Sequence, residues 1–248
     1  MGRRLGPVVP VVGRHPSLAS LLPERGLLRP APESGPGPGD RSLFWEAQLD
    51  RLAERVFGGE VGAQRAAPLL ARWDAAVGRT TAGDADHAVL QAARIDWALC
   101  DAELDAPGET WAWRAAHGVV PGIEADAAVQ ALARSQVGLF ELWPGRPAQL
   151  RGRIRGLCLR IDEPSLAAVR HERGGPLALW EVRVVFTPDG AQMCRPPITY
   201  PLEILPRLQR AHEQHWREPS RGLDLLQLRR MRLLWTRARK PDARAAFG

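Results

Sequence analysis

The spacing of hydrophobic residues changes twice along the chain and divides it into three parts. Up to about residue 137, apolar residues recur at intervals of three and four, which is typical of amphipathic helices. From Gly138 to Thr199 the period shortens to two, and glycine and proline separate short runs, as in antiparallel strands. After Pro201 the helical period returns. The pattern therefore predicts helices, a compact β module, and helices again.

Five helices are expected before the β module, each ended by glycine or by polar residues. Asp40 or Ser42 caps the first, and Gly58-Gly59 stops it after Phe57. Asp84 is the predicted N-cap of the third, because its carboxylate can accept hydrogen bonds from free backbone N–H groups. The predicted spans after the first helix are about Ala63–Val77, Ala85–Cys100, Glu109–His117 and Ile123–Ser135.

Leu177–Thr187 is the clearest strand of the β module. Its even positions are apolar, whereas Glu181 and Arg183 lie on the other face. The turn Pro188-Asp189-Gly190 follows, and Gln192–Arg195 is expected to pair back as a hairpin. Pro196-Pro197 is expected to end this pairing, because proline has no backbone donor.

Two earlier segments complete the predicted sheet. Leu139–Trp143 is a short strand, and Gln149–Ile161 is a strand region interrupted at Gly152 and Gly156. Read as one strand, this region would align Arg151, Arg153 and Arg155 on a single face. The two glycines favour a hairpin instead, which scatters the arginines around a turn.

The predicted fold class is α+β: an N-terminal helical region, a small antiparallel β-sheet or partial barrel, and two C-terminal helices. Those helices span about Leu202–Trp216 and, after a Ser220 cap, up to Lys240, and the tail beyond Pro241 is expected to fray. Residues 1–40, rich in proline and glycine, are predicted to be disordered. The expected domains are 1–40, the helical region 41–137, and 138–248.

Charge adds a second division to this picture. Residues 41–137 carry a net charge of −5 and residues 203–248 one of +6, almost all of the positive charge being arginine. The two parts could attract one another, or the basic part could face an acidic partner. The three cysteines form no disulfide framework and no metal-ligand spacing, which suggests a reducing cytoplasm. No run reaches the ~18 apolar residues of a membrane span.

The order of several short motifs also matches a known pattern, which begins at residues 95–101, Ile-Asp-Trp-Ala-Leu-Cys-Asp. They precede Gly108-Glu109-Thr110, then residues 135–142 (Ser-Gln-Val-Gly-Leu-Phe-Glu-Leu) and 150–156 (Leu-Arg-Gly-Arg-Ile-Arg-Gly). This order resembles uncharacterised bacterial proteins of GC-rich genomes related to SEC-C-motif-associated proteins. The resemblance covers roughly residues 95–200 and implies a fold pattern without an activity. This chain lacks the zinc-binding cysteine tail of that group, so the resemblance implies no zinc.

Candidate catalytic and metal groups all have simpler interpretations. His212 and His215 are three residues apart, whereas the helical zinc signature spaces its histidines by four. The acidic run Asp96, Asp101, Glu103 and Asp105 lacks the glycine and terminal glutamate of a calcium loop, so a solvated loop is expected. Cys100, Cys158 and Cys194 have no histidine nearby in sequence and are expected to be buried, unreactive thiols. We therefore predict no cofactor and no metal, while an active site assembled from distant residues stays open.

Tryptophan and arginine are the side chains best suited to a partner. Three tryptophans fall in register with the apolar residues around them and are expected in the core: Trp97, Trp180 and Trp235. Three others are out of register or at the edges of elements: Trp45, Trp113 and Trp143. The arginines that could contact a partner or nucleic acid are Arg151, Arg153, Arg221, Arg229, Arg230, Arg232, Arg237 and Arg239. The predicted function is a non-enzymatic cytoplasmic binding or protein-interaction module. The alternative is a nucleic-acid-binding protein that uses the basic C-terminal helix.

Overall fold

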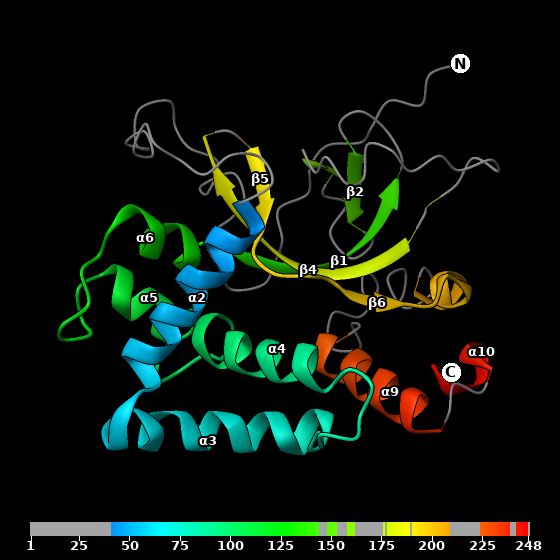
Figure 1. Ribbon diagram of the computed structural model, residues 1–248, viewed down its shortest axis with the longest axis horizontal. Coiled ribbons are helices and arrows are strands. Elements are labelled where there is room, and N and C mark those ends of the chain that lie inside the picture. The colour runs from blue at the N-terminus through cyan, green and yellow to red at the C-terminus, as the bar shows by residue number, and fades with distance from the viewer. Residues whose placement is uncertain are drawn as a thin grey trace.

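The computed structural model describes residues 41–143, 148–152, 158–161, 176, 178–188, 190–208, 224–238 and 242–247. Within these ranges the protein is α+β, as the hydrophobic pattern predicts: N-terminal helices, an antiparallel half-barrel sheet, and C-terminal helices (Figure 1). The segment 1–40, predicted to be disordered, lies outside the described residues.

All five predicted N-terminal helices are present; the first three end at the predicted residues, Phe57, Val77 and Cys100, and the other bounds differ by a few residues. They are α2 (Arg41–Phe57), α3 (Gly59–Val77), α4 (His87–Cys100), α5 (Trp111–Ala116) and α6 (Ala127–Ala133). Only Gly58 separates α2 from α3, and Gly59 has a φ of +68°, a conformation that side chains disfavour. The glycine pair therefore both ends one helix and allows the next to start at once.

The prediction that Asp84 caps α4 is wrong. Asp86 occupies the N-cap position and makes no capping hydrogen bond with its side chain. Asp84 instead accepts hydrogen bonds from the backbone N–H of Thr81 at 2.6 Å and from its hydroxyl at 3.2 Å. The Asp84 carboxylate therefore accepts hydrogen bonds from the loop before α4 and not from the backbone N–H groups at the start of the helix.

Within the described residues, six antiparallel strands form one curled sheet. Their order is β3-β2-β1-β4-β5, and β6 pairs with the same edge of β4 that holds β5. The strands β3 and β5, at opposite ends of this order, contact each other, so the sheet closes into a half-barrel. The bounds are β1 (Gln136–Trp143), β2 (Ala148–Gly152), β3 (Cys158–Ile161), β4 (Ala178–Thr187), β5 (Gly190–Met193) and β6 (Ile198–Tyr200).

The ambiguous region Gln149–Ile161 is a hairpin, as the two glycines suggest. Strands β2 and β3 pair with Arg151 opposite Cys158, and the connection between them lies outside the described residues. A single continuous strand with an arginine stripe is thereby excluded.

The strand β4 holds three partners along its length. Thr187 pairs with Gly190, whose φ of +118° permits the tight turn predicted here. β5 ends at Met193, before the predicted Arg195, but pairing resumes beyond Pro196-Pro197, where β6 lies opposite Leu179–Glu181. The two prolines therefore interrupt the pairing rather than end it, because Ile198–Tyr200 has donors again.

Helices cover one side of the sheet, and α4 lies between α3 and the strands (Figure 1). On this side Leu139 and Leu179 of the sheet pack with Leu90 of α4 and with Leu228 and Leu233 of α9 (Leu225–Arg237). On the other side of the sheet a second apolar cluster fills the half-barrel: Phe140, Leu142, Leu150, Leu159, Val182, Val184 and Met193. Both faces of β4 are therefore covered.

The C-terminal part begins with a 3-10 turn, η1 (Leu202–Ile204), followed by helical residues 205–208. The rest of the predicted helix Leu202–Trp216 and the predicted cap Ser220 lie outside the described residues; α9 is capped by Asp224. The expected fraying after Pro241 is wrong for residues 242–247, because Asp242 caps a short helix, α10 (Ala243–Ala246). Phe247 follows it and packs edge-on against Tyr200 and Trp235.

Candidate functional site

Arg229 of α9 turns into the protein. The residue is 2% exposed, and its Nε donates to Glu181 of β4 at 2.6 Å. Tyr200 donates its hydroxyl to the other oxygen of Glu181 at 2.8 Å, and the Arg229 guanidinium lies 4.7 Å from the centre of the Trp73 ring. Burial opposes the charge of Arg229, but the Glu181 carboxylate keeps its pKa above the ordinary value. Arg229 is therefore an internal ion-pair partner and not part of an exposed surface.

Two further arginines of α9 bind the acidic loop between α3 and α4. Arg232 pairs with Asp86 at 2.9 Å, and Arg237 pairs with Asp84 at 2.8 Å. The hydrogen bond from Arg237, together with that from the Thr81 backbone, holds the pKa of Asp84 well below its usual range. The attraction expected between the acidic and basic parts of the chain thus occurs within the molecule.

The remaining candidate arginines are dispersed. Arg230 is exposed and makes no ion pair within the described ranges, while Arg153, Arg221 and Arg239 lie outside them. Arg151 is exposed on β2, with its guanidinium 4.1 Å from the centre of the Trp143 ring. Because β2 and α9 lie on opposite sides of β1 and β4 (Figure 1), the structure does not gather Arg151 and Arg230 on one surface.

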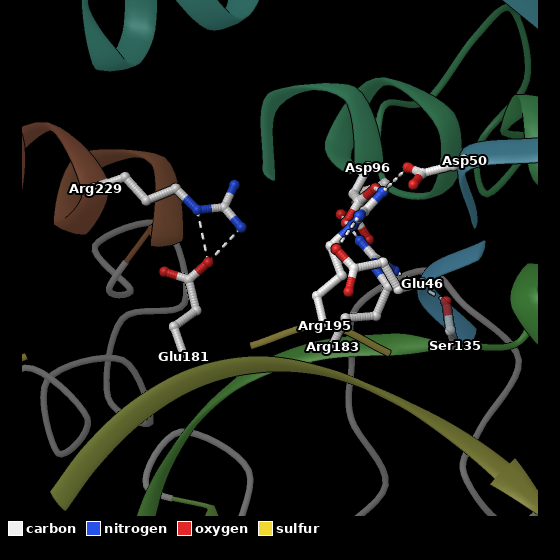
Figure 2. Close-up of polar contacts among 9 residues, drawn as sticks. Glu46, Asp50, Asp96, Ser135, Glu181, Arg183, Arg195 and Arg229 are labelled. Atoms are coloured by element: carbon white, nitrogen blue, oxygen red, sulfur yellow. Dashed lines mark hydrogen bonds and ion pairs between the residues drawn. The ribbon is translucent and has the colours of Figure 1, made fainter. Parts of the chain in front are cut away.

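A buried charge network joins the N-terminal helices to the sheet. Figure 2 shows Arg183 and Arg195 reaching up from the sheet into the helical layer. Arg183 donates to the Ser135 hydroxyl at 3.0 Å and pairs with Asp101. The interface between helices and sheet is therefore charged as well as apolar.

Arg195 carries the larger part of this network. Its Nε and one terminal nitrogen both bind Asp96, at 2.8 and 3.2 Å, and its other terminal nitrogen binds Glu46 at 3.0 Å. Asp50 of α2 accepts a further hydrogen bond from the guanidinium. Because Arg195 follows β5, this one side chain ties the sheet to both α2 and α4.

These contacts correct the expectation of a solvated acidic loop. Asp96 is only 5% exposed, and burial raises its pKa against the opposing effect of Arg183 and Arg195. Asp101 is held by Arg183, whereas Glu103 and Asp105 are exposed, as expected. One feature of the sequence does indicate buried ion pairs: Glu181 and Arg183 stand among apolar residues in β4, and charged side chains in a buried strand need partners.

The two buried thiols are not activated as nucleophiles. Burial raises the pKa of Cys100 to about 12 and also raises that of Cys194. Both residues are buried as expected, but the prediction is wrong for Cys158, which is exposed on the terminal strand β3. Within the described ranges no three His, Cys, Asp or Glu side chains are placed to hold a metal ion. His212 and His215 lie outside those ranges.

We define the aromatic corner as Trp113, His117 and Val119, three exposed residues at the C-terminal end of α5 and just after it. Trp113 is 38% and Val119 56% exposed. The His117 ring stacks on the Trp113 indole with centroids 3.9 Å apart, and Nδ1 of His117 lies 2.8 Å from the Trp113 carbonyl oxygen. The indole is thus held in place while much of it stays in contact with solvent.

Local hydrogen bonds fix the helix that carries this corner. The Thr110 hydroxyl caps α5 by accepting from the Trp113 N–H at 3.1 Å. Arg114 pairs with Glu109 and Asp105, each at 3.0 Å, and lies 5.2 Å from the centre of the Trp111 ring. The corner is therefore a preformed surface on a braced helix.

The other tryptophans follow the sequence interpretation only in part. Trp45, expected out of phase, is 6% exposed and donates its Nε1–H to Gln192 at 2.7 Å. Trp143 is half-buried, as are Trp97, Trp180 and Trp235, which were expected in the core. Trp113 is the residue for which an edge position correctly indicated exposure.

Comparison with protein-family models, with curated proteins and with solved structures finds no match to this chain. The resemblance to SEC-C-related proteins therefore stays a prediction. No helix in the described ranges is long and apolar enough to cross a bilayer.

Proposed function

We propose that the protein is a non-enzymatic cytoplasmic protein-interaction module whose partner docks on the aromatic corner. The observation that carries this proposal is the exposed, braced indole of Trp113. Tryptophan is strongly enriched among residues that dominate binding energy at interfaces, since it buries a large area with few rotatable bonds. An indole already fixed by His117 loses little further freedom on binding.

The test compares Trp113→Ala with a matched variant, Leu234→Ala. Leu234 is 54% exposed on α9, away from the corner, so its truncation removes exposed apolar surface of another region. Both proteins are used to capture partners from a lysate of the source organism, with quantitative mass spectrometry. We expect at least one protein to fall roughly tenfold with Trp113→Ala and to be retained by Leu234→Ala. Equal recovery by both variants would overturn the proposal.

The nucleic-acid alternative has weaker support. Of its candidate arginines, Arg229, Arg232 and Arg237 are bound to carboxylates within the protein, which leaves Arg151 and Arg230 as exposed candidates in the described ranges. Phosphate binding would show as a steep loss of duplex or single-strand affinity with rising salt. Absence of binding at ~50 mM salt would remove this alternative.

A further inference from the structure

Exposed carboxylates flank the aromatic corner on both neighbouring loops. Glu103 and Asp105 lie on the loop before α5, and Glu124 and Asp126 lie on the loop after it. The first loop is close to the corner because Asp105 pairs with Arg114, the residue next to Trp113. The second loop runs directly from the corner to α6, which packs against α5. We call these four carboxylates the acidic rim.

The acidic rim is only partly neutralised from within. Arg114 is the one basic residue between positions 103 and 126 apart from His117, and it already binds Glu109 and Asp105. The Glu103 carboxylate accepts the backbone N–H of Gly108 at 3.1 Å, and Arg72 donates to the Glu103 carbonyl oxygen at 3.2 Å. Glu103, Glu124 and Asp126 form no ion pair within the described ranges. The surface beside Trp113 is therefore negative overall.

Arginine already covers tryptophan rings elsewhere in this molecule. Arg229 lies over Trp73, Arg72 lies 5.5 Å from the centre of Trp97, and Arg65 lies 5.2 Å from that of Trp111. No arginine of the described ranges lies over Trp113. The corner thus presents an indole that is stacked on one face by His117 and lies between loops that carry carboxylates, the groups that bind a guanidinium inside the protein.

We propose that the partner of the aromatic corner is an arginine-bearing protein segment. This inference rests on the proposed function and names the chemistry of its partner. A guanidinium stacks on an indole face and forms paired hydrogen bonds with carboxylates, which a lysine ammonium does less well. The three rim carboxylates that form no ion pair within the described ranges, Glu103, Glu124 and Asp126, complement such a segment electrostatically.

The experiment uses the full chain labelled with ¹⁵N and three blocked pentapeptides as probes. These are Pro-Arg-Pro-Arg-Pro, the same peptide with lysine, and the same peptide with glutamine. The indole N–H signal of Trp113 is assigned by its loss in Trp113→Phe, and its shift is followed during titration. We expect the Trp113 signal to shift to saturation with the arginine peptide, and the glutamine peptide to bind roughly tenfold more weakly. The difference in affinity between these two peptides should disappear at about 0.5 M salt.

A matched pair of variants tests the role of the rim. Glu103→Gln with Glu124→Gln removes two of its three charges that form no ion pair, whereas Glu203→Gln removes an exposed charge on η1, away from the corner. We expect the first to reduce the preference for arginine over glutamine to about twofold and the second to leave it unchanged. Unchanged preference in both variants would overturn the inference.

The remaining outcomes separate this inference from the proposed function. Equal response of Trp113 to all three peptides, or no response to any, overturns an arginine-bearing partner. A Trp113 signal that moves with protein concentration alone points to a second copy of the chain and overturns it as well. In each case the proposed function still stands or falls on the capture experiment with Trp113→Ala.

Discussion

Two groups of the same residue types occupy opposite situations in this protein. The inner cluster consists of Trp73, Glu181 and Arg229, and the outer cluster of Glu109, Trp111 and Arg114. In both, a guanidinium pairs with a glutamate and lies about 5 Å from an indole centre. The inner Arg229 and Glu181 side chains are 3% and 2% exposed, whereas the outer Arg114 and Glu109 side chains are 21% and 19% exposed.

The difference lies in what each cluster connects. The inner cluster joins α3, β4 and α9, which are far apart in sequence, and it lies among the leucines of the core. The outer cluster joins residues within five positions and leaves the neighbouring Trp113 exposed. The same chemistry thus serves as a tertiary tie when buried and as a local brace at the surface.

The largest expected effect comes from breaking the inner cluster. Glu181→Ala leaves Arg229 and the Tyr200 hydroxyl buried without their acceptor, so we expect a loss of about 3–5 kcal/mol in the free energy of unfolding. Urea denaturation followed by circular dichroism measures it. Replacing the three hydrogen-bonded side chains together, with Glu181→Leu, Arg229→Met and Tyr200→Phe, should recover most of the lost stability. A single Glu181→Ala variant as stable as the wild type would contradict the ion pair.

A smaller effect is expected from the cap that holds the outer cluster. Thr110→Ala removes the hydrogen bond to the Trp113 N–H and should cost about 1 kcal/mol. Thr110→Ser keeps the hydroxyl and should be close to the wild type. If the alanine and serine variants unfold at the same urea concentration, the cap makes no contribution.

The ion pair between Asp84 and Arg237 should depend on pH. Because its folded-state pKa is lowered, Asp84 stabilises the fold above the ordinary carboxyl pKa of about 3.9, and this contribution is lost as the pH falls through the folded-state value. Asp84→Asn should therefore be less stable than the wild type at pH 7, and the difference should shrink below about pH 4. Thermal unfolding across this range measures it, and a constant difference would exclude the linkage.

The smallest effect on stability is expected at Trp113. Its indole is exposed, so Trp113→Ala should change the free energy of unfolding by no more than about 0.5 kcal/mol. Trp73→Ala, at the 1% exposed tryptophan of the inner cluster, should cost about 3–5 kcal/mol in the same assay. Similar losses at both positions would mean that the aromatic corner is structural.

The sequence predicts local structure well and long-range pairing poorly. The period of two in β4, the turn before Gly190 and the glycines around β2 and β3 determine the strands through local geometry. The N-cap assignment of Asp84 fails because polar backbone donors lie on both sides of this residue in sequence. The helix that it was expected to cap follows it, whereas Thr81, whose N–H it accepts, precedes it. The alternation of apolar and polar residues in β4 also places Glu181 on the face opposite the apolar side chains. It does not show whether water or Arg229 covers that face.

The site shows the same limit. Arg229 and Arg230 are adjacent and identical in type, yet one is buried and the other exposed, because only the packing of α9 on the sheet decides their directions. For Trp113 the phase of α5 was informative, since a short helix with buried Ala112 and Ala115 must turn position 113 outward.

The position of Arg195 late in the chain has a consequence for synthesis. Glu46, Asp50 and Asp96 leave the ribosome long before their common partner, roughly five to thirty seconds earlier at ordinary elongation rates. During that interval these three carboxylates lack their common partner and stay hydrated, because like charges on one surface repel one another. We therefore expect the helical region to remain loosely packed until the hairpin that leads into Arg195 is complete, so that final docking occurs after translation of the sheet.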